Sequence, residues 1–221
     1  MSESRTLCQT FHVADFYEQA KHVVVSLGFQ KELEWQHSLQ AHCFSESDLL
    51  RESAWVILCS GFRETIVRRM FDHISLCFCD WESARTICEL RHQCRSCALS
   101  RFSNMKKIDA ILRTAEYVDG IGFEQFKARI LTSPIAALQV LPFIGPVTAF
   151  HLAKNLGMPL AKPDRHLRRL ARDIGYADVQ RLCSDISKFT GDSIQVVDLV
   201  LWRYAERIAA NAFRTSADVK L

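Results

Sequence analysis

Prolines, glycines and long apolar runs are all scarce in this chain of 221 residues. No apolar segment approaches the ~20 residues that a membrane helix needs, and residues 1–10 lack the apolar stretch of a signal peptide. We therefore expect a monomer with no membrane partner, located in the cytoplasm or at the nucleoid. Alternating strand patterns bounded by Asn-Gly or Asp-Gly turns are nearly absent, which argues against a sheet.

The composition is that of an ordinary globular protein, with 48% apolar and 24% charged residues. These fractions exclude a disordered chain, a collagen-like repeat and a small disulfide-stapled scaffold. The net charge of +3 neither requires nor excludes a nucleic-acid partner, so such a partner must be argued from a local patch. Nine cysteines without a secretory signal are interpreted as reduced thiols or metal ligands.

Apolar residues three and four apart in proline-free stretches predict helices rather than strands. The predicted helices are 13–27, 49–74, 105–118, 179–189 and 194–213. The predicted fold class is therefore all-α.

All five prolines lie between residues 134 and 163, and this segment predicts two short helices. Ser133 followed by Pro134 is typical of a helix start, and this helix is expected to reach Leu141. A tight turn follows, and Pro146 is expected to open a second helix that ends near Leu156. Gly157 then supplies a left-handed residue after the helix.

Two motifs in this region resemble those of the helix-hairpin-helix DNA glycosylases, the superfamily of endonuclease III and the alkyladenine glycosylases. LPFIGPVTA at 141–149 is similar to the family's hairpin Leu-Pro-Gly-Val-Gly-x-x-Thr-Ala. PDRHLRRL at 163–170 resembles the family's Asp-Thr-His-Val-x-Arg stretch, at about the expected distance. Weaker likeness at 55–70, 104–118 and 194–206 extends the resemblance over roughly residues 49–212.

The resemblance implies two helical lobes with a helix-hairpin-helix motif and an active-site cleft between them. Residues 1–48 would form an N-terminal helical segment that joins the C-terminal lobe. Residues 49–157 would form the central lobe that ends in the hairpin, and residues 158–221 the lobe that carries the catalytic aspartate.

Asp164 is the candidate catalytic residue, because the resemblance assigns the family's aspartate to this position. Breaking an N-glycosidic bond creates positive charge on the sugar, which a carboxylate can stabilise while it orients or deprotonates water. Asp164 also directly precedes a helical pattern, so its alternative role is to cap that helix. Both roles are compatible.

Val147 stands where family members that also cut the DNA strand carry a lysine. Without that amine, no Schiff base forms at the site. The resemblance therefore implies a monofunctional glycosylase that leaves an abasic site, and Lys154, two turns further along, is a poor substitute.

A basic segment surrounds the two motifs and is the candidate contact with double-stranded DNA. Residues 151–175 hold six basic and two acidic side chains, a net charge of +4 that exceeds that of the whole chain. Charge alone favours a solvated helix face, but the neighbouring hairpin favours a backbone footprint. The candidate DNA-binding groups are the amides of Gly145, Val147 and Thr148 and the side chains of Lys154, Arg165, Arg168, Phe62 and Arg63.

Two departures from the family pattern affect these contacts. Phe143 stands where the hairpin usually has its first glycine, and Pro146 removes one amide donor. The loop at 60–63 lacks the family's wedging glutamine, so Phe62 or Arg63 is the candidate to fill the gap left by a flipped base. The plain alternative is a core Phe and a surface Arg.

No cofactor is required by this interpretation, although a structural monovalent cation at the hairpin is compatible with the resemblance. The C-terminal half holds only Cys183, so the family's iron–sulfur loop is absent. Zinc is not expected at the remaining cysteine group, which has one CxxC rather than two. That group comprises Cys77, Cys79, Cys88, Cys94 and Cys97, with His73 and His92 nearby.

The sequence defines the reaction more closely than it defines the base that is excised. Trp55, Phe102 and Trp202 are candidates for the base pocket, although core packing is the alternative for each. The divergent N-terminus and altered wedge loop favour an unusual base such as a hypermodified phage-type cytosine, with an alkylated or deaminated base as the other option. The competing functions are a non-catalytic helix-hairpin-helix DNA-binding module and a zinc-stabilised helical interaction protein.

Overall fold

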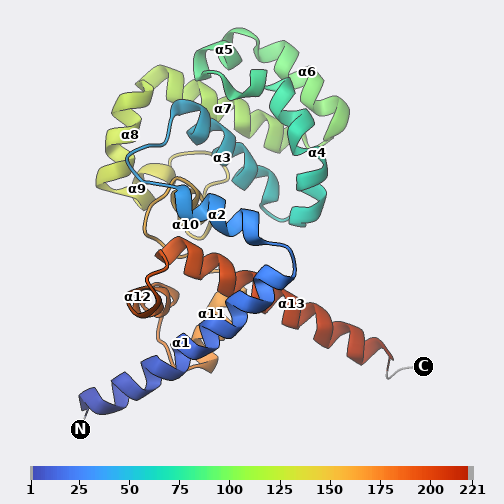
Figure 1. Ribbon diagram of the computed structural model, residues 1–221. Helices are drawn as coiled ribbons and strands as arrows, with labels where there is room; N and C mark the ends of the chain where they lie inside the picture. Colours follow the sequence, from blue (N-terminus) through green and yellow to red (C-terminus); the bar gives the residue numbers. More distant parts are fainter. Residues whose placement is uncertain (1, 219–221) are drawn as a thin grey trace. The chain divides into compact units, whose positions relative to one another are not determined.

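The computed structural model describes residues 2–218 and is helical throughout (Figure 1). Among these residues there are thirteen α-helices, one 3-10 helix and no strand, which confirms the all-α prediction. The described chain divides into two compact units. Unit 1 combines residues up to 39 with residues from 159 onward, and unit 2 comprises residues 40–158.

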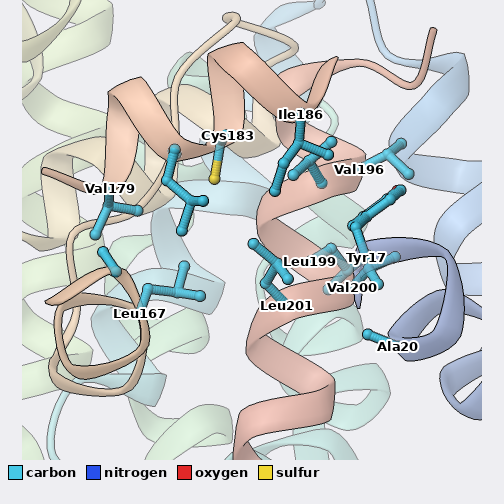
Figure 2. Close-up of a cluster of buried hydrophobic side chains, with 14 of the residues drawn as sticks. Tyr17, Ala20, Leu167, Val179, Cys183, Ile186, Val196, Leu199, Val200 and Leu201 are labelled. Atoms are coloured by element: carbon cyan, nitrogen blue, oxygen red, sulfur yellow. The ribbon is translucent and has the colours of Figure 1, made fainter. Parts of the chain in front are cut away.

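Unit 1 is built by the first two and the last three helices, so the N-terminal segment packs with the C-terminal part of the chain. On the first helix, Val13, Tyr17, Ala20 and Val24 form one buried stripe at helical spacing. They pack in one core with residues of the last three helices (Figure 2). The helices of unit 1 are α1 (Ser2–Ser26), α2 (Gln30–Ser38), α11 (Arg165–Asp173), α12 (Val179–Thr190) and α13 (Ile194–Asp218).

Unit 2 holds the remaining helices around α7, which packs against α3, α5, α6 and α8. Short α9 and α10 are neighbours and are connected by residues 139–147, the α9–α10 loop. The elements are α3 (Glu46–Cys59), α4 (Glu64–Cys77), η1 (Cys79–Trp81), α5 (Ala84–Glu89), α6 (Arg91–Arg101), α7 (Met105–Ile121), α8 (Phe123–Thr132), α9 (Pro134–Leu138) and α10 (Thr148–Asn155).

Most predicted helices are confirmed, but the prediction of one helix over 49–74 is wrong. The chain breaks between α3 and α4, where Gly61 has a left-handed φ of 76°. Residues 60–63, the α3–α4 turn, connect the two helices. The unit boundaries also differ from the expected domain limits, because α3 begins at Glu46 and unit 2 already begins at residue 40. Within the described chain, no helix is both long and apolar enough to span a bilayer.

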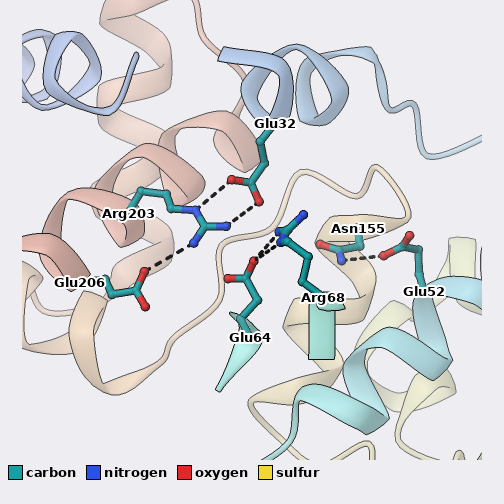
Figure 3. A network of polar contacts seen from close by, with 7 residues as sticks. All are labelled: Glu32, Glu52, Glu64, Arg68, Asn155, Arg203 and Glu206. Carbon is teal, nitrogen blue, oxygen red and sulfur yellow. Dashed lines mark hydrogen bonds and ion pairs between the residues drawn. The ribbon is translucent and has the colours of Figure 1, made fainter. Parts of the chain in front are cut away.

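Buried polar contacts fix helices within each unit (Figure 3). In unit 1, the Arg203 guanidinium on α13 donates to both carboxylate oxygens of Glu32 on α2, at 2.9 and 2.7 Å. In unit 2, Asn155 of α10 donates to the buried carboxyl of Glu52 on α3 at 2.8 Å. Burial raises the pKa of Glu52, while this hydrogen bond acts in the opposite direction. The bond holds α10 against α3.

Gly157 ends α10 as predicted, with a φ of 83°. A Cβ at this position would lie 2.6 Å from the carbonyl carbon of Gln40 and 2.8 Å from the amide nitrogen of Ala41. Both the backbone conformation and the close approach of another backbone segment therefore require glycine.

We predict that Gly157→Ala destabilises unit 2 by about 3 kcal/mol, which combines left-handed strain with a backbone overlap. Gly61→Ala is the matched control, because Gly61 has a similar φ and open space around the added Cβ. It is expected to lose only about 1 kcal/mol. Urea unfolding followed by circular dichroism measures both, and equal losses would contradict the close approach to Gln40.

Candidate functional site

The ammonium of Lys107 closes the end of α3. Its Nζ donates to the carbonyl oxygens of Ile57, Leu58 and Ser60, with distances of 3.1 Å to Leu58 and 2.6 Å to Ser60. These are carbonyls of the last turn of α3 and of the residue after it, which lack partners inside the helix. A cation at a helix C-terminus is also favoured by the helix dipole.

Lys107 also joins two loops of unit 2. Its Nζ lies 5.2 Å from the ring centroid of Phe62 in the α3–α4 turn and 5.4 Å from that of Phe143 in the α9–α10 loop. The residue is only 3% exposed, and burial lowers the pKa of its ammonium to about 8. One buried cation therefore positions both loops.

The expected wedge residues lie on the surface of the α3–α4 turn. Phe62 is 39% exposed and Arg63 is also exposed, so neither is a core residue. The ring of Phe62 contacts that of Phe102 edge to face, with centroids 5.4 Å apart. Together with Ser103 and Met105 they line a shallow hollow beside the turn.

Phe143 adopts a left-handed conformation, with φ of 63°. This is the position at which the resembled motif has a glycine, a residue that adopts the left-handed conformation without strain. A left-handed Phe is strained, and its ring is 42% exposed. Strain of this kind persists at functional positions more often than elsewhere.

Only two of the three expected loop amides are available. The amide of Gly145 donates to Thr148 Oγ1 at 2.6 Å, so it is not free for a phosphate. The amides of Val147 and Thr148 have no acceptor within residues 2–218, and both residues are partly exposed. They form an N-terminal donor pair on α10.

Lys154 differs from its expected role. It is 4% exposed on the buried side of α10, where its charge slightly opposes the rise that burial causes in the pKa of Glu52. Its burial removes it from the set of surface phosphate contacts. The expected phosphate contact was based on the net charge of residues 151–175. Net charge does not show which face of α10 carries Lys154, and that face is turned toward α3.

Sequence reasoning missed a basic hollow beside Phe143, formed by α6 and α7. Two of its basic residues already hold carboxylates, since Arg91 pairs with Glu116 and Arg95 pairs with Asp109 at 2.6 Å. Lys106 and Arg113 have no ion-pair partner in the described part of the chain. The density of basic residues at 91–113 was the available signal. The lining residues are Arg91, His92, Arg95, Lys106, Asp109, Arg113 and Phe143.

The three aromatic candidates for a base pocket are engaged in packing. In unit 2, the ring of Trp55 has the Arg68 guanidinium 5.3 Å from its centroid and Phe71 at its edge. In unit 1, the ring of Trp202 has the Arg203 guanidinium at 4.6 Å. Phe102 is buried against Phe62, as described above. The packing alternative is therefore observed for all three, and Phe102 also lines the hollow beside the α3–α4 turn.

Asp164 in unit 1 caps α11, as its alternative role predicts. Its Oδ1 accepts hydrogen bonds from the amides of His166 at 2.9 Å and Leu167 at 3.0 Å. Its other oxygen, Oδ2, has no hydrogen-bond donor among residues 2–218, and the side chain is partly exposed. One oxygen thus fixes the carboxylate while the other is available.

The backbone before Asp164 is held by the last two helices. Gln180 of α12 accepts from the amide of Ala161 at 2.8 Å, and buried Asp198 of α13 accepts from the amide of Lys162 at 2.6 Å. These bonds fix the approach of the chain to α11.

Arg165 and Arg168 extend the cationic surface next to Asp164. Both are exposed, and neither pairs with a carboxylate in the part of unit 1 that is described. The Nε of Arg165 donates to His166 Nε2 at 3.2 Å. Both side chains remain candidates for phosphate contacts.

The cysteine group is divided by the structure. Cys77 and Cys97 are joined by a disulfide, so the expectation of reduced thiols is wrong for this pair. Cys79 and Cys94 are free thiols that share a hydrogen bond, and burial raises the pKa of Cys94 to about 11. Cys88 lies on α5, outside the convergence of His73, Cys77 and Cys97.

Comparison of the chain with known protein families, with curated proteins and with solved structures finds no match.

We predict that Lys107→Met destabilises unit 2 by about 2 kcal/mol, because the last carbonyls of α3 lose their donor. The methionine keeps the apolar stem, so the change isolates the ammonium. Hydrogen exchange at the amide of Phe62 should become faster in this variant. The exposed neighbour Lys106→Met is the control and should change stability by less than about 0.5 kcal/mol.

We predict that Phe143→Gly is more stable than Phe143→Ala by about 1 kcal/mol. Both variants lose the same ring, so their difference is the left-handed strain of alanine less the greater conformational entropy that glycine loses on folding. The ordinary order at a surface position is the reverse. Thermal or urea unfolding of the two variants decides, and an alanine variant of equal or greater stability would contradict the left-handed backbone.

Proposed function

We propose that this protein is a monofunctional DNA N-glycosylase that flips a modified or damaged base from duplex DNA and hydrolyses its N-glycosidic bond. The observation that carries the proposal is the carboxylate of Asp164, which is fixed through one oxygen and presents the other without a donor from any residue that the structure describes. This position is also the one that the motif resemblance assigns to the family's catalytic aspartate.

The proposed chemistry needs one anion beside the sugar of the extruded nucleotide. As the bond to the base breaks, positive charge develops on the sugar, and the free oxygen of Asp164 stabilises it. The same carboxylate orients the water that attacks the sugar and accepts its proton. Because capping holds the group in position, little reorganisation is needed during the reaction.

Unit 2 supplies the groups that suit a duplex backbone. The amides of Val147 and Thr148 are donors for a phosphate oxygen, in the manner of a helix-hairpin-helix motif. Lys106 and Arg113 of the basic hollow add cationic contacts beside the exposed ring of Phe143. Phe62 or Arg63 is the wedge that fills the space of the flipped base. A monovalent cation at the hairpin remains an expectation.

The absence of strand cleavage is part of the proposal. Val147 supplies no amine at the position of the family's lyase lysine, and Lys154 on the same helix is buried. Without a Schiff base, the product is an abasic site that breaks only after alkali.

The substrate is proposed as a hypermodified phage-type cytosine, with alkylated or deaminated bases as the second option. The enzyme would act as a monomer on double-stranded DNA, in the cytoplasm or at the nucleoid. A hypermodified base fits the departures from the family pattern at Phe143 and in the α3–α4 turn, which are the surfaces proposed to meet the duplex.

We predict that Asp164→Asn lowers the rate of base release by at least about 100-fold, because asparagine retains the cap but not the charge. The assay incubates duplex DNAs with glucosylated cytosine, alkylated purine, uracil and mispaired adenine, and counts alkali-labile sites. Borohydride should trap no protein–DNA adduct in the wild type.

The matched control is Asp178→Asn, which makes the same change at another N-cap of unit 1. Asp178 accepts from the amide of Arg181 at 2.8 Å and has no proposed chemical role. It should retain full activity. DNA binding by all three proteins with no base released from any duplex would support the non-catalytic binding module instead.

A further inference from the structure

Three potential metal ligands converge where the end of α4 meets α6. His73 and Cys77 lie on α4, and Cys97 lies on α6. The ligand atoms of these three side chains all lie within 4.8 Å of one another. His73 and Cys97 are exposed, so the group can be reached from solvent.

The residue types and their spacing suit a zinc ion. His73 and Cys77 are four residues apart on α4 and therefore share a helix face, and Cys97 meets them from α6. The H-x3-C spacing falls within the ligand spacings of zinc sites, and two cysteines with one histidine leave the fourth position of a tetrahedral zinc ion to water. Cys94, on the same helix as Cys97, is a buried free thiol that shares a hydrogen bond with Cys79 and is not one of the converging ligands.

The backbone between the two helices is constrained in the same place. Cys79, Asp80 and Trp81 have positive φ values of 55°, 51° and 64°, and none of them is glycine. Three consecutive left-handed residues are costly and persist where their surroundings fix them. This turn brings the thiol of Cys79 to that of Cys94.

We propose that the reduced protein binds one zinc ion through His73, Cys77 and Cys97, with water as the fourth ligand. The ligand set is smaller than the group considered from sequence, because it leaves out Cys79, Cys88, Cys94 and His92. The inference is independent of the proposed glycosylase activity.

The zinc-bound and disulfide states use the same two sulfur atoms and therefore exclude each other. A dithiol reductant breaks the Cys77–Cys97 bond, becomes a disulfide itself and leaves a hydrogen on each sulfur. Zinc then displaces the protons of the two thiols into solvent, and neutral His73 donates a ring-nitrogen lone pair. Either state ties α4, which follows the α3–α4 turn, to α6, which carries Arg91 and Arg95.

The test loads the full chain with zinc after anaerobic reduction by a phosphine and removes excess metal by gel filtration. Mass spectrometry of the metal content should give one zinc per chain. His73→Ala, a change at an exposed position, should weaken zinc binding at least 10-fold against a chromophoric chelator, and so should Cys97→Ser. Cys43→Ser, an exposed cysteine elsewhere in unit 2, is the control and should bind as the wild type does.

Cobalt provides a second readout on the wild type that needs no variant. The reduced protein should show the absorption bands of tetrahedral, thiolate-bound cobalt, and zinc should remove them. Reduced wild type without zinc or cobalt bands would overturn the proposal. Zinc retained equally by His73→Ala and Cys97→Ser would also overturn it, as binding elsewhere.

Discussion

The ammonium of Lys107 is the interaction on which unit 2 depends most. It caps the end of α3 by donating hydrogen bonds to the carbonyl oxygens of Ile57, Leu58 and Ser60. It also lies against the rings of Phe62 and Phe143. A buried cation is tolerated here because three carbonyl oxygens and two aromatic rings replace its water. The exposed rings of Phe62 and Phe143, which we propose contact DNA, are therefore both positioned by the ammonium of Lys107. Stability and the proposed recognition surface share this contact.

Unit 1 combines stability and proposed chemistry in a different way. Asp164 satisfies two amides of α11 with one oxygen, and Gln180 and Asp198 fix the backbone that leads to it. Because the carboxylate of Asp164 already caps α11, little additional free energy is needed to hold it in one orientation. Catalysis by a single carboxylate benefits from such preorganisation, since the group does not move when charge develops on the sugar.

The sequence predicted those helix ends that contacts between nearby residues determine. The starts predicted from apolar periodicity at residues 105 and 179 agree with α7 and α12, whose first turns are capped by Asn104 and Asp178, and the end of α10 follows from Gly157. The break in the predicted helix over 49–74 falls at the left-handed Gly61, a local signal that apolar periodicity does not take into account. Periodicity also could not show that Lys107, 47 residues after Ser60, supplies the donor for the last carbonyls of α3. For the same reason charge counting could not show that Lys154 is buried. The basic hollow was also missed, because residues of α6, α7 and the α9–α10 loop meet only in the folded unit.

The central claim is that this chain releases a base from DNA. The most direct measurement is mass spectrometry of the low-mass fraction after the wild-type protein is incubated with duplexes that carry each candidate base. The account predicts one free base, in amounts equal to the abasic sites left in the duplex and with intact strands before alkali. Duplexes that are bound but yield no free base would contradict it.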